Sequence, residues 1–496
     1  MMSMNFFKNI KYEHKMFMLF LLIHLVVWSV IGMIRTVLPT DALEGIYWGS
    51  LQDFGTPKHP PLAGWLTYLT YIIFKSDFSI YFISQLFVVA GFFYVYRIAK
   101  YFLDENRAIC SVILLEGCWV YGYITGYYGF NPDVILLLFL PMITFYFIKC
   151  MEENKPVDWI KLGLIVGISF MNKYQTVLTL AAMFIWACIY KREVFKNKYF
   201  YLSVLIAFIL FLPHLLWLIK YDFFPLLYFE GEFEDNTILK HIIAPFIFFI
   251  VQVSLIIGSC LIFGLLKIRQ KSEFKLIEIT KDKKTVFLLL FTFVPLLIHI
   301  LMGAFGGGTM RPRWGFVFWY MIGIMLFYFF PTKEITKDDL KYVFKSAMCV
   351  MLTIFISLGT LLTVEKNYRS RYNVPQVYND MKQAWAEQVG TNLKYFGGYI
   401  EWTLPLTIYG KDHEQIILDT NGYKNVWIDE NDLRKSGILV LDRTPEKVER
   451  QVKKSCPFLE EDYQINPIEY KFTIWNALRQ PREYTIYYHI VLPNKN

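Results

Sequence analysis

The chain has 496 residues, of which 55% are hydrophobic and 19% aromatic, and its mean hydropathy is +0.36. A soluble globular domain of ordinary composition is less apolar than this, so the composition predicts a membrane protein with many spanning segments. The formal net charge is +8, and the Lys and Arg residues gather in short loops between apolar segments, as expected of loops kept in the cytoplasm. This placement argues against nucleic acid as a partner.

We predict eleven membrane-spanning helices from the apolar segments taken in chain order. The first is too long for the apolar core of a cleavable signal peptide and lacks a small-residue cleavage site, so it is expected to remain in the protein. A shorter apolar segment, 60–74, carries Trp65, Tyr68 and Tyr71 at helical spacing and is predicted to be an interfacial helix along the outer surface. The eleven spans are expected at 16–38, 79–97, 108–125, 132–149, 160–172, 175–190, 199–219, 241–266, 285–303, 313–330 and 346–364.

This topology places every strongly basic loop on one side of the membrane and a set of polar residues on the other. The outer set is expected at the level where the head group of a lipid substrate would lie. Its members are Asp41, Glu44, Lys58, His59, Asn131, Asp133, Lys173, Arg311 and Arg313.

The stretch from Asp41 to Trp65 directly follows the first span and carries the acidic pair on which the functional prediction depends. Asp41 and Glu44 are three residues apart, and Lys58 and His59 come next, before a double proline. A carboxylate can remove a proton from an alcohol or amine acceptor, while Lys or Arg neutralises a departing phosphate. Glycosyl transfer from a sugar carried on a lipid phosphate fits this combination.

From residue 366 to residue 496 the chain is charged and polar and has no spanning segment, which predicts a soluble domain. Segments 437–442 and 484–492 have the apolar patterns of strands, and segment 374–389 has helical spacing, so an α/β fold is expected. Six of the seven cysteines lie in or at the ends of spans and only Cys456 lies in this domain. No disulfide framework or metal knuckle is therefore predicted.

The pattern D-x-x-E-x-x-x-W-G begins at Asp41, and K-H-P-P-L-x-x-W begins at Lys58. Further motifs follow, namely GYYGFNPD at 126–133, NKY at 172–174, PHLLWLIKYDFFP at 213–225, MRPRWGFVFW at 310–319 and YFGGYIEWTLPLTIYGKDHEQIILD at 395–419. Over nearly the whole chain these motifs resemble the bacterial family 39-type glycosyltransferases of the GT-C fold. That family is related to the protein O-mannosyltransferases and to the aminoarabinose transferase that modifies lipid A.

The resemblance implies a polytopic α-helical membrane protein of the GT-C fold, with an outer interfacial helix and a C-terminal α/β domain. It divides the chain into a transmembrane catalytic module, residues 1–365, and an extracytoplasmic, periplasmic domain, residues 366–496. It also implies a multi-pass protein of the bacterial inner membrane whose active site lies on the periplasmic face.

Carried over by position, Asp41 matches the acidic residue of the family's first outer loop, which implies a base or an acceptor-orienting group, with Glu44 assisting. The family's usual adjacent Asp-Glu pair is spread over these two positions, so the division of their roles stays open. Aminoarabinose transferases have Glu-Lys before the double proline, where this chain has Lys58 and His59. The missing carboxylate weakens the case for a metal there. No cofactor is predicted, and a divalent metal is left open.

The remaining candidate residues are expected to bind substrate. Lys58 or His59 would meet the donor phosphate or its sugar, and a bidentate guanidinium suits the remainder of a phosphate clamp. The further clamp candidates are Lys173, Arg311 and Arg313, and the further substrate-binding candidates are Tyr128, Asn131, Asp133 and Tyr174.

Simpler structural roles compete with these assignments. His214 is better explained by a helix-packing hydrogen bond than by ligand binding. The glycine run 306–308 is expected to be a flexible loop, because no strand precedes it as in a phosphate cradle. The competing structural roles for the candidates themselves are a solvated helix end for Asp41 and Glu44, snorkelling for Lys58, a helix-start acid for Asp133, a loop cation for Lys173 and interfacial anchoring for Arg311 and Arg313.

The sequence therefore predicts an inverting enzyme that moves a sugar from a polyprenyl (undecaprenyl) phosphate to an extracytoplasmic acceptor. By family analogy, lipid A or lipopolysaccharide core is favoured over a protein acceptor, and membrane lipids are expected partners. The competing functions are a protein O-glycosyltransferase and a lipid-linked sugar flippase or transporter. Charges gathered at one face, without an evident inverted repeat, argue against a transporter.

Overall fold

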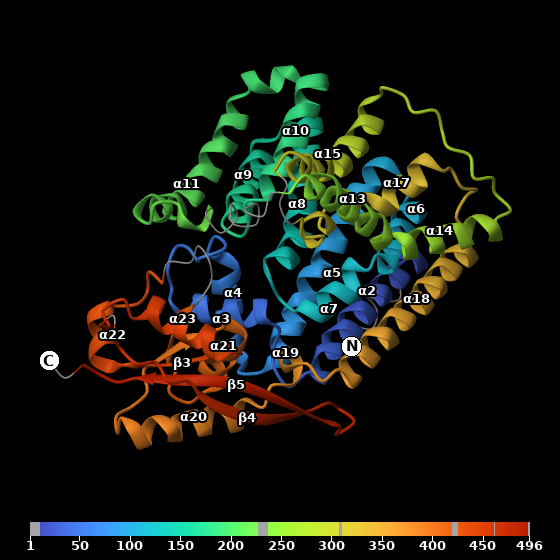
Figure 1. Ribbon diagram of the computed structural model, residues 1–496. Coiled ribbons are helices and arrows are strands. Elements are labelled where there is room, and N and C mark those ends of the chain that lie inside the picture. The colour runs from blue at the N-terminus through green and yellow to red at the C-terminus, as the bar shows by residue number, and fades with distance from the viewer. Residues whose placement is uncertain (1–9, 227–236, 307–309, 419–424, 461, 495–496) are drawn as a thin grey trace, which may run out of the picture.

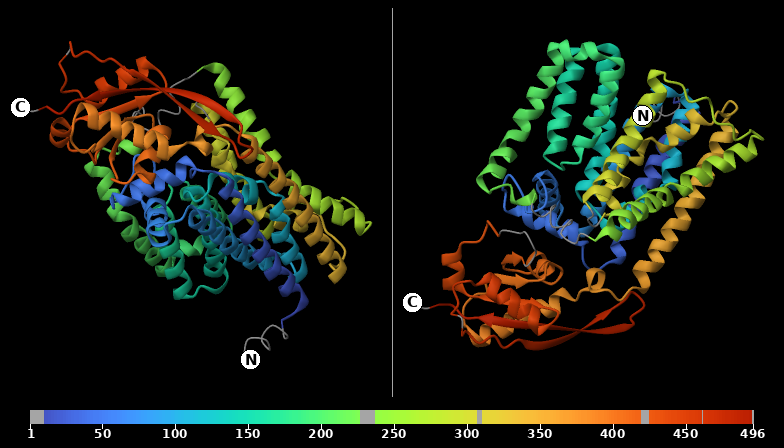
Figure 2. Two further views of the ribbon diagram at one scale, coloured as in Figure 1. Left: turned by 90° about the horizontal axis from the view of Figure 1, so that it is seen from below. Right: turned by 45° about the horizontal axis from the view of Figure 1, so that its top comes forward.

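The computed structural model describes residues 10–226, 237–306, 310–418, 425–460 and 462–494. Most of the glycine run 306–308 lies outside these residues. A bundle of helices contains the chain up to Val364, and a mixed sheet with its own helices follows (Figure 1). The sheet lies at one end of the bundle, with the blue segment that contains α3 (Thr40–Ser50) and α4 (Leu62–Phe74) beside it (Figure 2).

Every segment predicted to span the membrane is helical, although three of them are interrupted. The uninterrupted helices are α2 (Tyr12–Ile31, continued by η1, Gly32–Ile34), α5 (Asp77–Phe102), α8 (Pro132–Glu153), α9 (Pro156–Phe170), α10 (Thr176–Tyr190), α11 (Lys198–Lys220), α15 (Lys283–Gly306) and α18 (Lys337–Val364). The interrupted segments are α6 (Glu105–Ile113) with η2 (Leu114–Gly117), η3 (Val120–Ile124) and α7 (Thr125–Tyr128); α13 (Ile238–Leu255) with α14 (Ile257–Arg269); and α16 (Arg313–Phe316) with η5 (Trp319–Met321) and α17 (Ile322–Phe329). A short helix, η4 (Arg192–Lys196), links α10 to α11.

Fewer helices meet the length of a membrane span than the eleven that the sequence predicts. Among the described residues, seven single helices are long and apolar enough to cross a membrane, or eight if the bent pair 105–117 and 120–128 is one span. Helices α9 and α10 have 15 residues each, and at 1.5 Å per residue they rise only about 22 Å, less than a hydrocarbon core of about 30 Å. Hydropathy along the sequence detects apolar segments but not the breaks and bends within them.

The acidic stretch after the first span folds as a helix, α3, and packs closely on α4. The predicted interfacial segment 60–74 forms α4, which begins just after the double proline. Small residues allow the two helices to meet, since a Cβ on Gly49 would lie 2.1 Å from the carbonyl oxygen of Gly64 and one on Gly45 would lie 2.8 Å from Thr67 Oγ1. This close contact fixes the direction of α3 and hence of its acidic side chains.

We expect Gly49→Ala to destabilise the protein, because its Cβ would overlap backbone that cannot move aside. Overpacking of this kind costs about 1 to 3 kcal/mol, which would show as a lower midpoint of thermal unfolding. Gly359→Ala is the matched control, since its Cβ would meet Ile31 Cδ1 at 3.4 Å, an ordinary contact. Equal midpoints for the two variants would show that the contact between α3 and α4 is looser than described.

The predicted C-terminal α/β fold is confirmed. Five strands form one sheet in the order β2-β1-β3-β5-β4, in which β1 is parallel to β2 and β3, and β5 is antiparallel to β3 and β4. Strands β3 and β5 cover all but one residue of each of the expected strands 437–442 and 484–492, and the expected helix is α20. The elements are α19 (Tyr368–Arg371), α20 (Val374–Gln388), β1 (Tyr395–Gly398), α21 (Ile400–Tyr409), β2 (Gln415–Leu418), α22 (Glu430–Ser436), β3 (Ile438–Asp442), α23 (Pro445–Ser455), β4 (Ile468–Trp475) and β5 (Pro481–Val491).

Polar contacts join the sheet region to the bundle beside α3. The hydroxyl of Tyr47 on α3 accepts a hydrogen bond from Ile416 N at 2.9 Å, at the edge strand β2. The hydroxyl of Tyr409, at the end of α21, accepts one from Leu38 N at 3.0 Å and donates one to Asp77 at 2.8 Å. Because α21 also packs against α3, the sheet region covers the end of the bundle at which the acidic pair lies.

Candidate active site

The structure brings most of the candidate residues together around α3. A small cavity of about 50 Å³ lies there, which is room for a few water molecules rather than for a sugar. Helices α3, α4, α8 and α16, with the loops before α10 and α16, form its walls. Its lining includes Asp41, Glu44, Lys58, His59, Asn131, Asp133, Lys173, Arg311 and Arg313.

A large cavity of about 620 Å³ adjoins the small one. Its walls come from the end of the first span, from the bent segment η3–α7, from α13 and, across the junction, from α19 and α21 of the sheet region. Its volume lies in the range of small-molecule sites. The two cavities share Asp41, Glu44, Lys58, Arg311 and Arg313.

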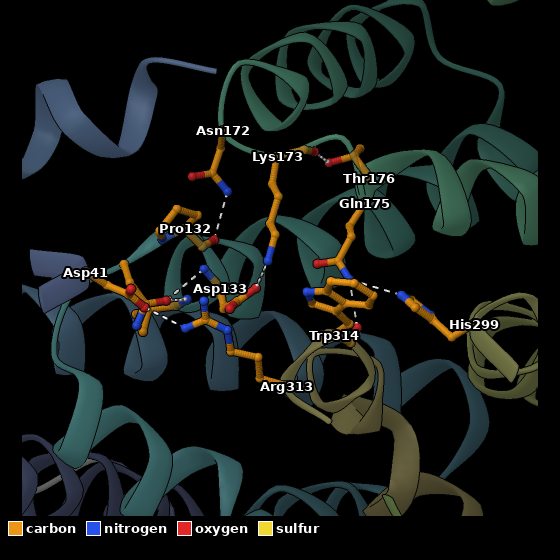
Figure 3. A network of polar contacts seen from close by, with 12 residues as sticks. Asp41, Pro132, Asp133, Asn172, Lys173, Gln175, Thr176, His299, Arg313 and Trp314 are labelled. Carbon is orange, nitrogen blue, oxygen red and sulfur yellow. Dashed lines mark hydrogen bonds and ion pairs between the residues drawn. The ribbon is translucent and has the colours of Figure 1, made fainter. Parts of the chain in front are cut away.

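Asp41 and Arg313 form an ion pair on the wall between the two cavities. Arg313 Nη1 donates to Asp41 Oδ2 at 2.7 Å (Figure 3). Burial alone would raise the pKa of Asp41, but Arg313 and then Lys58 outweigh it, so the pKa lies below its ordinary value. The carboxyl group of Asp41 is therefore ionised and held by a cation, in a place that a substrate could reach.

Glu44 forms the second ion pair, with Lys58. It lies three residues after Asp41 on α3 and therefore on the same helical face. Lys58 Nζ donates to Glu44 Oε1 at 2.5 Å and lies over the ring of Trp48 at 5.6 Å. Burial raises the pKa of Glu44 above its ordinary value, and the neighbouring Lys58 only partly offsets this. The two carboxyl groups thus differ in basicity although they lie side by side.

A third ion pair closes the small cavity, between Asp133 at the start of α8 and Lys173 before α10 (Figure 3). Both side chains are buried. Burial lowers the pKa of Lys173, and Asp133 only partly offsets the effect. Arg313 lines the same cavity. Cations and acids therefore alternate around the small cavity.

Asn131 has an evident structural role. Its side-chain oxygen accepts hydrogen bonds from Asp133 N at 2.9 Å and Val134 N at 3.3 Å, so it caps the first turn of α8. Its amide group donates to Gly129 O at 3.1 Å. Asn172 donates to Pro132 O at 2.9 Å and joins the turn before α10 to the same helix start (Figure 3). This hydrogen bond thus fixes the position of the motif NKY relative to the motif GYYGFNPD.

His59 lines the small cavity as a neutral group. Burial, followed by the neighbouring Lys173 and Lys58, lowers the pKa of His59 well below its ordinary value. The turn that carries it is fixed by Thr56, whose hydroxyl donates to His59 O at 2.8 Å and accepts from His59 N at 2.9 Å. In the part of the chain that the structure describes, no group of three His, Cys, Asp or Glu residues could hold a metal ion.

Two candidates lie apart from the small cavity. Tyr128 lines the large cavity instead, with the guanidinium of Arg313 6.0 Å from its ring centre. Tyr174 lines neither cavity, because its hydroxyl bonds His214 Nε2 at 2.7 Å, and His214 Nδ1 in turn donates to Phe54 O at 2.7 Å. Tyr174 and His214 therefore join helices, which agrees with the packing role expected for His214.

Four residues in or beside the cavities are not among the candidates from the sequence. Gln175 donates to Trp314 O at 2.8 Å and bonds His299 at 3.2 Å, so it fixes the turn beside Arg313 (Figure 3). Arg35, Arg369 and Glu401 line the large cavity. No local pattern marks these last three, because Arg35 lies more than 300 residues before Arg369 and Glu401 and meets them only at the junction of the two parts.

Comparison with known proteins identifies the architecture. Residues 58–217 match the family model described as dolichyl-phosphate-mannose-protein mannosyltransferase. The chain is similar to two crystal structures of ArnT from Cupriavidus metallidurans, one bound to undecaprenyl phosphate and one in the apo state, with TM-scores of 0.63 and 0.62. Each comparison covers 95% of this chain and 97% of the ArnT chain, at 11% sequence identity. The chain has the GT-C glycosyltransferase fold.

The fold expected from the family resemblance is thus confirmed, and residues 58–217 are similar in sequence to a family of sugar transferases. The matched segment begins at Lys58 and includes Asp133 and Lys173, while Asp41 and Arg313 lie outside it. No curated protein matches the chain in sequence. The chain thus shares its fold with ArnT at low sequence identity, and its function must be inferred from its own site.

Proposed function

We propose that this GT-C enzyme transfers a sugar from a polyprenyl phosphate, such as undecaprenyl phosphate, to an extracytoplasmic acceptor with inversion at the anomeric carbon. The observation that carries this proposal is the alternation of Asp41, Glu44 and Asp133 with Arg313, Lys58 and Lys173 around one small cavity. Such a site offers both a base and cations for a leaving phosphate. The similar ArnT structure bound to undecaprenyl phosphate supports the choice of carrier.

The donor phosphate would lie where the two cavities meet. Arg313 and Lys58 line both cavities, and their present partners are carboxylates, which are oxyanions as a phosphate is. A phosphate at this point can take both cations, because a guanidinium binds two oxygens at once and an ammonium supplies a point charge. The sugar would then occupy the adjoining large cavity, since the small one holds only water-sized groups.

Donor binding would also prepare the base. Once Arg313 and Lys58 turn to the phosphate, the largest effect that remains on Asp41 is burial, which raises its pKa. Asp41 can then accept the proton of the acceptor hydroxyl or amine as its oxygen or nitrogen attacks the anomeric carbon. The bond from that carbon to the phosphate oxygen breaks, the electron pair leaves with the polyprenyl phosphate, and the configuration inverts. Glu44 would assist by holding Lys58 until the donor arrives.

A pH dependence follows from this exchange of partners. In the free enzyme the pKa of Asp41 lies below its ordinary value, whereas in the donor complex burial, no longer offset by Arg313 and Lys58, should raise it. A base acts only when ionised, so we expect the acid limb of kcat at higher pH than the acid limb of kcat/KM for the donor. Rate profiles across the acidic and neutral range measure both limbs, and coincident limbs would contradict the exchange.

The acceptor and the location follow by analogy with the family. We favour lipid A or lipopolysaccharide core over a protein acceptor, because the GT-C resemblance that the motifs carry includes a transferase that modifies lipid A. The enzyme would reside in the bacterial inner membrane with its active site, and residues 366–496, on the periplasmic side. The basic loops that the sequence places on the opposite side support this orientation.

The test of the function is transfer of radiolabelled sugar from a panel of undecaprenyl-phosphate sugars into membrane acceptors by the purified enzyme. Transfer of one sugar, with release of undecaprenyl phosphate, would support the proposal and identify the donor. Movement of labelled lipid across vesicles without any transfer would overturn it in favour of a flippase.

A further inference from the structure

The large cavity carries more positive than negative charge. Three ion pairs account for its three acids, namely Asp41 with Arg313 at 2.7 Å, Glu44 with Lys58 at 2.5 Å and Glu401 with Arg369 at 2.7 Å. The lining also contains Arg35, which forms no ion pair among the described residues. This surplus of cations in a partly enclosed space favours an anionic ligand over a neutral one.

Arg35 is a cavity residue whose guanidinium is only partly satisfied. It follows η1 at the end of the first span, and its guanidinium lies over the ring of Tyr127 at 4.3 Å. Its Nη1 donates to Arg369 O at 3.3 Å. Its Nε and Nη2 are buried and have no hydrogen-bond partner among the described residues. These two nitrogens form one edge of the guanidinium, which can donate two parallel hydrogen bonds to an oxyanion.

The backbone around Arg35 is fixed by the sheet region rather than by the bundle alone. The next residue, Thr36, donates its N–H to Ser370 O at 2.9 Å, and its hydroxyl donates to the same oxygen at 3.2 Å. Arg369 is held in turn by Glu401, which also accepts a hydrogen bond from the hydroxyl of Tyr368 at 2.5 Å. The backbone that carries Arg35 is therefore held in place before a ligand binds, which reduces the entropy lost on binding.

We propose that Arg35 binds an oxyanion of the acceptor, a phosphate or a carboxylate that does not itself react. This inference rests on the proposed function, in which Arg313 and Lys58 bind the donor phosphate at another place in the same cavity. Tyr123, Tyr127 and Tyr128 line the cavity beside Arg35 and offer ring faces for a sugar. The acceptor would thus be anchored at Arg35 and would present its hydroxyl or amine to Asp41.

The test measures anion binding without any transfer. The full chain in nanodiscs, first saturated with undecaprenyl phosphate to fill the donor site, is titrated calorimetrically with inorganic phosphate and, separately, with acetate. We expect Arg35→Gln to weaken binding of the preferred anion about tenfold or more. Arg35→Lys should restore only part of this binding, because an ammonium keeps the charge but lacks the paired planar N–H donors of a guanidinium. The anion that binds more tightly shows whether the charged group of the acceptor is a phosphate or a carboxylate.

Arg482→Gln is the matched control. Its guanidinium also lies over a tyrosine ring, that of Tyr484 at 4.9 Å, and also donates to a backbone carbonyl, that of Lys366 at 3.5 Å. It does not line the large cavity, so this variant should bind both anions as the wild type does. Equal binding by the Arg35→Gln protein and the wild type would overturn the inference.

A kinetic measurement then assigns the anion to the acceptor. With lipopolysaccharide as acceptor, Arg35→Gln should raise the KM for the acceptor about tenfold and leave the KM for the donor unchanged. A raised donor KM with an unchanged acceptor KM would overturn the assignment to the acceptor. If the wild type transferred no sugar at all, the proposed function would fail, whereas the calorimetric comparison would still decide the anion site.

Discussion

Asp41→Asn should abolish most sugar transfer while the enzyme still binds its donor. The amide has the same shape and can still accept the hydrogen bond from Arg313, but it cannot take a proton, so we expect kcat to fall by about 10² to 10⁴-fold. Without the carboxylate charge, Arg313 is more available to the donor phosphate, so the donor should bind as tightly as before or more tightly. Radiolabel transfer and direct binding of undecaprenyl phosphate measure the two effects.

Asp53→Asn is the matched control for this substitution. Asp53 lies in the same connection between α3 and α4, but its carboxylate accepts a hydrogen bond from the N–H of Phe54 and lines neither cavity. Its variant should transfer sugar at the wild-type rate. Full activity of the Asp41→Asn protein would show that another group, Glu44 in the first place, acts as the base.

Arg313→Gln should produce the second large loss of activity, because the variant stabilises the leaving phosphate less well. The guanidinium lines both cavities, and its removal leaves the departing oxyanion with fewer charged donors. Loss of one such donor costs about 10² to 10³-fold in rate. The same change removes the main cation that lowers the pKa of Asp41, so burial should then raise that pKa. We therefore expect a lower kcat/KM for the donor together with an acid limb moved to higher pH.

Arg97→Gln controls for the loss of an arginine from an aromatic environment. Its guanidinium lies over the ring of Phe145 at 4.8 Å, on α5 and away from both cavities. This variant should keep wild-type kinetics and the wild-type pH profile. An Arg313→Gln protein with the same donor kcat/KM as the Arg97→Gln protein would remove Arg313 from the phosphate clamp.

Much of the candidate site can be predicted from local sequence because its residues lie in short motifs at element ends. Asp41 and Glu44 are one helical turn apart, and a short connection separates Lys58 from them. Their proximity therefore depends little on tertiary packing. Lys173 and Arg313 could be placed on the same side of the membrane by counting spans. That they meet Asp133 and Asp41, respectively, is a result of helix packing.

Tyr174 shows that neighbouring residues of one motif can have different partners. It directly follows Lys173, and the motif NKY favours a shared role for the two. In the structure the Lys173 side chain points to Asp133 in the cavity, whereas the Tyr174 hydroxyl bonds His214 on α11. Adjacent side chains at a helix start point in different directions, so sequence neighbourhood alone does not assign a residue to a site.

A membrane protein with a C-terminal α/β region and an acidic pair beside cations can be predicted from the sequence, because apolar length and local charge are properties of short segments. The breaks in the apolar segments, the pairing of each carboxylate with its cation, and the meeting of Arg35 with Arg369 and Glu401 at one cavity are visible only in the folded chain. These features depend on burial and on contacts between distant segments, which no local pattern records.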